Sequence, residues 1–267
     1  MRPIFVELGP FSIRFYGLMY IIGILLALVM LRREARRKGL PLTEDEVLNL
    51  IMLLVFGGIL GARLYYVAFN WDYYWAYPWA IPAVWQGGLA IHGGLLGGLL
   101  AGAWFVRRHR IPLWRLGDTI APNLILGQAL GRFGNFMNGD AHGVPTDLPW
   151  GLVFAPNTPA GMQFGTTPLH PVMLYEMAID LGIFAVLWRL RTRSSRDGFL
   201  FGLYVLLYSG GRFVVEVFRA DSLLLGPFRA AQVVSLLAIL GVGVLLWRGR
   251  LWAMAPQPQA APRSGQC

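Results

Sequence analysis

Hydrophobic and polar positions divide this chain into long blocks. Mostly apolar runs of about 17 to 23 residues recur along it, and a run of that length can cross the roughly 30 Å hydrocarbon core of a bilayer as an α-helix. We therefore predict an all-α, polytopic integral membrane protein with seven transmembrane helices. The predicted spans are residues 15–31, 47–69, 88–106, 118–137, 172–190, 198–217 and 231–247.

The composition supports this class of protein. Hydrophobic residues fill 56% of the 267 positions and charged residues only 14%, whereas about 25% of the residues in a typical soluble domain are charged. The one cysteine, Cys267, is the last residue, so we expect no disulfide, no thiolate metal site and no cysteine nucleophile. Metal-binding spacings such as HExxH are absent from the sequence, and we expect no metal and no cofactor.

The basic residues indicate the orientation. The net charge is +9, and 16 of the 23 Lys and Arg residues lie after the first, third, fifth and seventh spans or in the tail. The positive-inside rule then puts the N-terminus outside and the C-terminus in the cytoplasm. These arginines lie between apolar spans and match no nucleic-acid motif, so we expect no nucleic-acid partner. The first span runs directly into a basic loop, so we expect no cleavable signal peptide.

The connections differ in composition. We predict one membrane domain over residues 1–250. Inside it, residues 139–170 are rich in Gly, Pro and Thr and too long for a tight turn, which favours a small extracytoplasmic cap. Residues 70–87 contain many Trp and Tyr but no Lys or Arg, a composition typical of the membrane interface. Residues 251–267 cannot bury a core, and we predict a disordered cytoplasmic tail.

Glycines four residues apart form stripes within the predicted spans. Such stripes let helix backbones approach each other closely in lipid, so we expect them to mark helix–helix contacts. The stripes are Gly57 and Gly61, then Gly94, Gly98 and Gly102, and finally Gly127 and Gly131.

Three arginines, Arg63, Arg132 and Arg212, lie at least five residues from either end of a predicted span. A charged side chain near the middle of a span costs about 2.5–3.5 kcal/mol on insertion scales, so it normally has a partner or a function. With the predicted orientation, all three fall in the outer half of the bilayer. We infer a polar cavity open toward the outer leaflet. Other ionisable residues in that half include Tyr16, His92, Glu176, Asp180 and Glu216.

Helical spacing groups some of these residues. Tyr208, Arg212 and Glu216 are each four residues apart and share one helix face, as do Arg132 and Asn135 at a spacing of three. The guanidinium fork matches phosphate and stays charged at any working pH, and phosphate in the outer leaflet belongs to lipid headgroups. We therefore interpret the arginines as a headgroup site.

An alternative remains open for the same arginines. Arg212 could pair with Glu216, and Arg132 with Glu176 or Asp140, only to neutralise buried charge. His92 has a similar alternative. It lies among glycines at the start of a predicted helix, where free N–H groups can bind an anion, and it can exchange a proton near neutral pH. A purely structural histidine fits that position too.

Five segments resemble the signature segments of prolipoprotein diacylglyceryl transferases. They are YGLMY (16–20), IHGGLLGG (91–98), GRFGNFMNGDAHG (131–143), HPVMLYE (170–176) and YSGGRFVVE (208–216). The resemblance implies transfer of a diacylglyceryl group from phosphatidylglycerol to the lipobox cysteine of a bacterial prolipoprotein, with formation of a thioether and release of glycerol phosphate. It also implies that the partners are phosphatidylglycerol, other membrane lipids and prolipoprotein signal peptides. The expected location is the bacterial cytoplasmic (inner) membrane, with the active site facing the outer leaflet.

The resemblance also implies roles for individual residues. The catalytic set is His92, Arg132, Arg212 and Tyr16, with the histidine as candidate base. The substrate-binding set is Arg132, Asn135, Asn138, Asp140, Gly143, Tyr208, Glu216 and Arg63. One position departs from the family pattern, because Asp140 stands where the family usually has glutamate. The resemblance implies a contact from this residue to the motif backbone or to an arginine, with a side chain that is one bond shorter.

Some questions stay open at this stage. The sequence does not decide whether Glu176, Asp180 or His170 takes part directly, and His142 receives no role. A membrane transporter for an anionic solute is the alternative function, since it would also use arginines and glycine-rich helices. Against it, the spans show no clear inverted repeat, and the predicted charges occupy one leaflet without lining a through-path.

Overall fold

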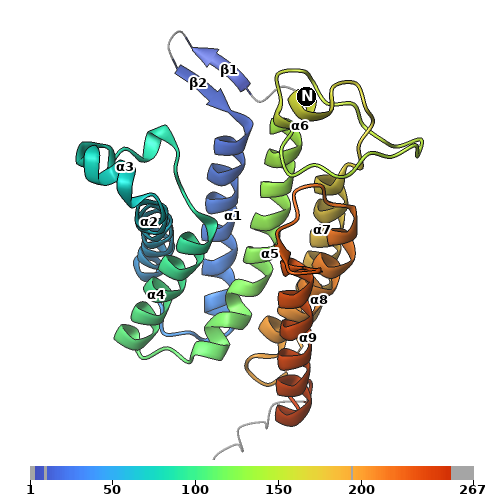
Figure 1. Cartoon of the computed structure of the whole chain (residues 1–267). Helices are drawn as coiled ribbons and strands as arrows, with labels where there is room; N and C mark the ends of the chain where they lie inside the picture. The colour runs from blue at the N-terminus through green and yellow to red at the C-terminus, as the bar shows by residue number, and fades with distance from the viewer. Residues whose placement is uncertain (1–3, 9–10, 194, 254–267) are drawn as a thin grey trace, which may run out of the picture. The chain divides into compact units, whose positions relative to one another are not determined.

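The structure is a computed structural model that describes residues 4–8, 11–193 and 195–253 (Figure 1). It is mostly helical. The predicted tail lies almost entirely outside the described residues. The long helices are α1 (Phe15–Arg37), α2 (Glu44–Phe69), α4 (Ile91–His109), α5 (Leu113–Asn138), α7 (Val172–Leu190), α8 (Phe199–Val215) and α9 (Ala230–Gly249). The short helices are α3 (Trp71–Ala76), α6 (Pro159–Phe164), η1 (Pro78–Ala80), η2 (Val84–Gln86) and η3 (Glu216–Phe218).

A long helix occupies each of the seven predicted spans. Among the described residues, four helical segments are long and apolar enough to cross a membrane: α1, α2, α8 with η3, and α9. Helix α1 runs six residues beyond its predicted end, to Arg37. Basic residues in a last turn interact favourably with the helix dipole, so the basic connection continues the helix.

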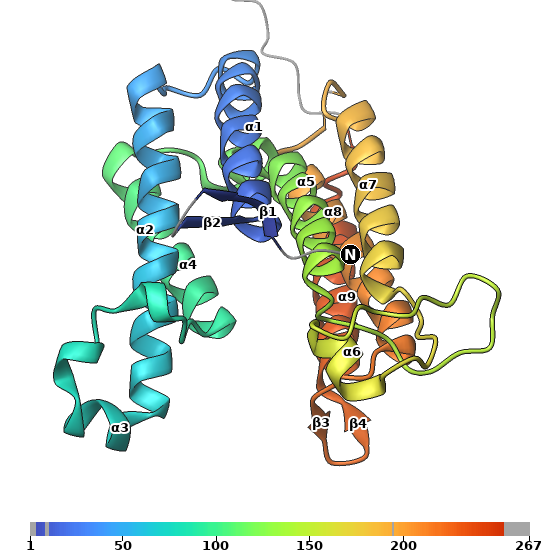
Figure 2. The ribbon, with the colours of Figure 1, turned by 90° about the horizontal axis from the view of Figure 1, so that it is seen from above.

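The structure contains two small sheets, which the all-α prediction did not include. Strands β1 (Ile4–Leu8) and β2 (Phe11–Arg14) pair antiparallel, as do β3 (Leu224–Leu225) and β4 (Phe228–Arg229). Strands of two to five residues are too short to produce a clear alternating pattern. The β3–β4 hairpin connects η3 to α9, and Figure 2 shows it at one end of α8 and α9.

The chain divides into two compact units. The first contains residues 1–23 and 120–267, and the second contains residues 24–119. In the first unit, α8 packs against both α7 and α9. Its apolar core joins α5, α7 and α8 through the buried side chains of Ala121, Ile125, Ile183, Leu187 and Leu200.

In the second unit, α2 and α4 pack side by side through glycines. A Cβ added at Gly61 would lie 2.3 Å from the carbonyl oxygen of Gly93, and one at Gly97 would lie 2.1 Å from the carbonyl oxygen of Gly57. No side chain fits in such a space, so the two backbones are in direct contact. The expectation for Gly57 and Gly61 is therefore confirmed.

The predicted stripe on α4 is confirmed in part. Cβ atoms added at Gly94 and Gly102 would lie 3.5 Å from Cβ of Ala62 and 3.4 Å from Cδ2 of Leu54, both on α2, but the tightest contacts come one residue earlier. Gly93 and Gly97 make the backbone contacts, whereas a Cβ at Gly98 would have no described neighbour within 4 Å. Glycines fill 93, 94, 97 and 98 alike, so spacing alone could not select the register. The same test finds no described neighbour for Gly127 or Gly131, and the predicted close contact there is wrong for the described part of the chain.

The predicted cap, residues 139–170, folds around its own small core. Phe154, Ala160 and Leu169 are buried against Met173 of α7. Isolated β-bridges connect Leu169 to Leu152 and to Pro145. Backbone hydrogen bonds of this kind satisfy the polar groups of a long connection that has little regular structure.

Candidate active site

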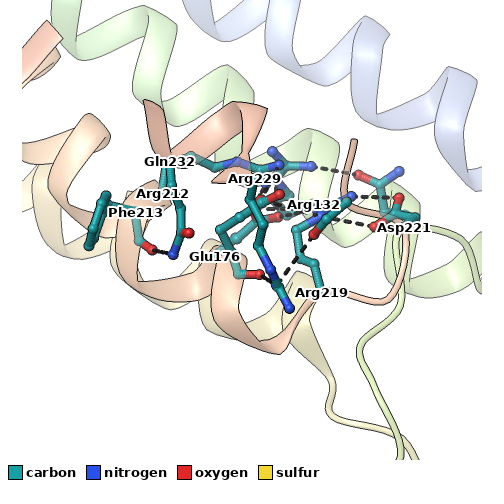
Figure 3. Close-up of polar contacts among 11 residues, drawn as sticks. Arg132, Glu176, Arg212, Phe213, Arg219, Asp221, Arg229 and Gln232 are labelled. Carbon is teal, nitrogen blue, oxygen red and sulfur yellow. Dashed lines mark hydrogen bonds and ion pairs between the residues drawn. The ribbon is translucent and has the colours of Figure 1, made fainter. Parts of the chain in front are cut away.

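A cluster of charged side chains in the first unit centres on Glu176 of α7 (Figure 3). One carboxylate oxygen, Oε2, lies 2.9 Å from Nε of Arg132 and 3.3 Å from Nη1 of Arg219. The other, Oε1, accepts a hydrogen bond from Nη1 of Arg212. Glu176 is only 5% exposed. Three guanidinium groups, one from α5 and two from the end of α8 and the residues after it, therefore meet at one buried carboxylate.

Each arginine reaches the cluster from a different position. Arg132 lies near the end of α5, Arg212 lies in the last turn of α8, and Arg219 directly follows η3. Helix α8 passes through η3 without a break, and this places Glu216 one turn beyond Arg212. Nη2 of Arg212 lies 2.8 Å from Oε2 of Glu216, which is 1% exposed.

The two glutamates leave part of two arginines accessible. The side chains of Arg132 and Arg212 are 21% and 20% exposed, whereas that of Arg219 is 8% exposed and also binds Asp221 through two hydrogen bonds of 3.0 and 2.7 Å. Charge-assisted pairs of this kind fix the orientation of a guanidinium group. Glu176 can therefore hold Arg132 and Arg212 in place while about a fifth of each side chain stays accessible.

Asp140 organises the amides predicted to bind substrate. Its Oδ1 accepts a 2.6 Å hydrogen bond from Asn135, and its Oδ2 accepts a 2.7 Å bond from Asn138. Asn135 in turn accepts a 3.5 Å bond from Arg132. Sequence reasoning anticipates a contact from Asp140 to the motif backbone or to an arginine, but the side chain contacts two amides. The aspartate is long enough for that contact.

Gly143 acts through its backbone. Its N–H donates to the carbonyl oxygen of His170 at 3.1 Å, and a Cβ added there would lie 2.6 Å from Cβ of His170. Gly143 also forms an isolated bridge with Arg219. Gly143 is thus bonded to His170, just before α7, and to Arg219, just after η3. Helix α7 and the segment around η3 both contribute residues to the cluster.

Two tyrosines of the predicted site lie in the same unit. The ring of Tyr16 packs against Gly134, where an added Cβ would lie 2.8 Å from Cδ2 of the ring. Its hydroxyl accepts a 3.4 Å bond from Tyr20. Tyr208, one turn before Arg212, stacks on Tyr204 with ring centres 6.0 Å apart.

Arg63 and His92 belong to the other compact unit. Arg63, on α2, is 5% exposed and donates to four backbone carbonyls: Ala80 at 2.6 Å, Ile81 and Gly87 at 2.7 Å, and Gly88 at 3.0 Å. His92 is exposed in the first turn of α4, with its ring 6.0 Å from that of Tyr65. Through its four hydrogen bonds, Arg63 holds together the loop between η1 and α4.

Sequence reasoning missed Arg219. Arg219 lies seven residues after Arg212 and three after Glu216, a spacing that continues the same helical stripe. That spacing was the available signal. The ion-pair alternative correctly named two contacts that occur, Arg212 with Glu216 and Arg132 with Glu176.

The fold and this cluster define a helical membrane protein with a buried, arginine-rich site suited to an anion. A family model described as "Prolipoprotein diacylglyceryl transferase" matches residues 3–248. The chain belongs to the prolipoprotein diacylglyceryl transferase family.

Several curated relatives carry the name phosphatidylglycerol–prolipoprotein diacylglyceryl transferase. The relative from Gloeobacter violaceus is 46% identical over 264 residues, which cover 96% of this chain and 96% of that protein. The relative from Geobacillus kaustophilus is 44% identical over 265 residues, with 94% of each chain covered. The relative from Trichormus variabilis is 44% identical over 256 residues, with 92% of this chain and 89% of that protein covered.

Proposed function

We propose that this chain transfers the diacylglyceryl group of phosphatidylglycerol to the lipobox cysteine of prolipoproteins. The names of the relatives and the match along nearly the whole chain support this activity. In the reaction, the cysteine thiol loses its proton and the thiolate attacks the glycerol carbon that carries the phosphate. The carbon–oxygen bond breaks as the thioether forms, and its electrons leave with glycerol phosphate.

The single observation that carries this assignment is the shared carboxylate of Glu176. Arg132 and Arg212 bind its two different oxygens, so their guanidinium groups are close enough to bind one phosphate together. We propose that their accessible sides grip the lipid phosphate. Negative charge grows on the leaving phosphate in the transition state, and fixed cations in a water-poor site stabilise it without reorganising. Arg219 would support the same charge from a more buried position.

We propose supporting roles for the other predicted residues. We propose that Asn135 contacts the headgroup, with Asn138 and Asp140 holding its orientation, and that Glu216 and Gly143 position the arginines. Tyr208 and Tyr16 would line the same site, and His92 remains the candidate proton acceptor. We do not assign Arg63 to the reacting phosphate, because its hydrogen bonds go to the carbonyls of its own loop.

We propose that α4, α5 and α7 cross the membrane together with the four more apolar helices, which gives seven spans in one membrane domain. The N-terminus would then face outward, residues 139–170 would form an extracytoplasmic cap, and the active site would face the outer leaflet of the bacterial inner membrane. The distribution of basic residues supports this orientation. The signal peptide, itself in the bilayer, would enter from the side.

The direct test uses purified protein, phosphatidylglycerol and a synthetic lipobox peptide. We expect the peptide cysteine to gain the mass of one diacylglyceryl group, and we expect Arg132→Ala and Arg212→Ala to abolish this gain while the protein still inserts. Near-normal transfer by Arg212→Ala would refute the arginine assignment. Flux of an anion without product would support a transporter, and headgroup binding without product would support a lipid-binding scaffold.

A further inference from the structure

The second unit contains a pocket whose lining shares no residue with the cluster at Glu176. A cavity of about 390 Å³ lies beside the loop that follows α2. Its polar lining comes from one arginine, three tyrosines and two amides. These residues are Arg63, Tyr66, Asn70, Tyr73, Tyr74 and Gln86. Sequence reasoning recognised the aromatic composition of this segment but found no site in it.

The pocket has a positive wall. Arg63 is buried, and its four acceptors are neutral carbonyl oxygens, so its hydrogen bonds leave the full charge in place. None of the ion pairs found in the described part of the chain includes Arg63. The only acidic residue between positions 47 and 117 is Asp72, which is exposed and does not line the cavity. A buried cation without a counter-ion is unfavourable, and an entering anion would relieve that cost.

The wall is built tightly around the guanidinium group. A Cβ added at Gly88 would lie 2.6 Å from Nη1 of Arg63 and 2.8 Å from Cε1 of Tyr66. Gly88 also has φ of +70°, a conformation that side-chain-bearing residues rarely adopt. The guanidinium carbon lies 5.1 Å from the centre of the Tyr74 ring. Backbone and aromatic contacts therefore fix the charge at the edge of the cavity.

The surroundings of the pocket point to lipid. Large aromatic side chains in the same segment are strongly exposed, including Trp71 at 53%, Trp79 at 71% and Trp85 at 78%. Trp and Tyr with one apolar and one polar end concentrate at the headgroup level of membranes. Tyrosine hydroxyl and amide groups in the lining can donate hydrogen bonds to phosphate oxygens, and the lining contains no carboxylate that would repel them.

We propose that this pocket binds the phosphate-bearing headgroup of a second anionic phospholipid, separate from the lipid that reacts. The site does not depend on the transfer activity, because none of its lining residues belongs to the arginine cluster at Glu176. Its chemistry is that of a phosphate ligand, which a lipid headgroup or free phosphate could supply. The aromatic surface favours the lipid.

The test counts bound lipids by native mass spectrometry of the full chain in detergent, titrated with dihexanoyl-phosphatidylglycerol. We expect two lipids on the wild type. Gln86→Glu and Asn70→Asp add a negative charge to the lining and should weaken one of the two at least tenfold. Asn49→Asp, on an exposed position of the same helix α2 outside the lining, should still bind two. Equal thermal unfolding of the variants checks that they fold.

Three further arms separate the outcomes. Arg212→Ala should lose the reacting lipid and keep the pocket lipid, so failure of the proposed transfer site and failure of the pocket are distinguishable. Dihexanoylglycerol, which lacks phosphate, should not fill the pocket. If inorganic phosphate fills it and the phospholipid does not, the lipid assignment is overturned. Unchanged stoichiometry in both Gln86→Glu and Asn70→Asp overturns the site altogether.

Discussion

The two compact units bury arginine in opposite ways. In the second unit, Arg63 is held by neutral backbone carbonyls, and the helices beside it contact each other backbone to backbone. In the first unit, Arg132, Arg212 and Arg219 are held by the carboxylate of Glu176, which comes from another helix. The carbonyl contacts of Arg63 organise a loop around one charge, whereas the carboxylate of Glu176 fixes several charges relative to one another.

This difference has a chemical consequence. An arginine bonded only to carbonyls keeps its full charge and can attract an anion through that charge, but few of its N–H donors are left to orient the ligand. An arginine paired with a carboxylate is partly neutralised, but the ion pair fixes its orientation, and Arg132 and Arg212 each keep about a fifth of the side chain exposed. The carboxylate-held arginines of the first unit suit catalysis, where the cations must be in place before negative charge develops on the leaving group.

Replacing Glu176 with glutamine should have the largest effect. The substitution keeps the shape but removes the charge that holds three guanidinium groups. Removing one partner from a buried ion pair typically destabilises a protein by about 3–5 kcal/mol. We expect Glu176→Gln to lower the free energy of unfolding by a few kcal/mol and to reduce transfer severely, as measured by denaturant unfolding in detergent and by the lipobox peptide assay.

The matched control for that change is Glu44→Gln. Glu44 pairs with Arg32 and Arg36, but its side chain is 53% exposed. Exposed pairs contribute about 0–1 kcal/mol, so Glu44→Gln should leave stability and transfer close to wild type. If both substitutions had equally small effects, Glu176 would not be the centre that organises the first unit.

The second unit should respond to a single methyl group. In Gly97→Ala, the new Cβ would lie 2.1 Å from the carbonyl oxygen of Gly57, so α2 and α4 must separate. Overpacking of this kind costs about 1–3 kcal/mol, against a gain of up to about 1 kcal/mol in helix propensity. We expect a lower unfolding temperature for Gly97→Ala. In Gly98→Ala, the new Cβ would have no described atom within 4 Å. We therefore expect an unfolding temperature equal to that of the wild type or slightly higher.

The glycine pair also indicates what sequence could and could not predict. Long apolar blocks located all seven long helices, because hydrophobic length is a property of one segment. Which α4 glycines make the closest backbone contacts depends on how α4 faces α2, and that is a property of two segments together. Equal glycine content at 93, 94, 97 and 98 hides the answer.

For the charged cluster, too, the sequence predicted contacts within one helix but not contacts between helices. The spacing of Arg212 and Glu216 placed them on one face of one helix, and their ion pair follows from that spacing. That Arg132 meets Glu176 was one of two open alternatives, because α5 and α7 are separated by the cap. Arg219 escaped notice since it follows the helix end, where its direction depends on η3 continuing the turn.

The smallest effect should come from Asp140, which acts on the first unit through amides rather than through a guanidinium group. Asp140→Asn removes the charge that orients Asn135 and Asn138, and hydrogen bonds to a charged group contribute about 1.5–3 kcal/mol. Because one oxygen acceptor remains, we expect roughly a tenfold fall in kcat/KM, with KM for phosphatidylglycerol raised more than kcat is lowered. Asp140→Glu keeps both acceptors and should retain most activity. Loss of activity in Asp140→Glu equal to that in Asp140→Asn would mean that side-chain length, and not charge, holds the two amides in register with Arg132.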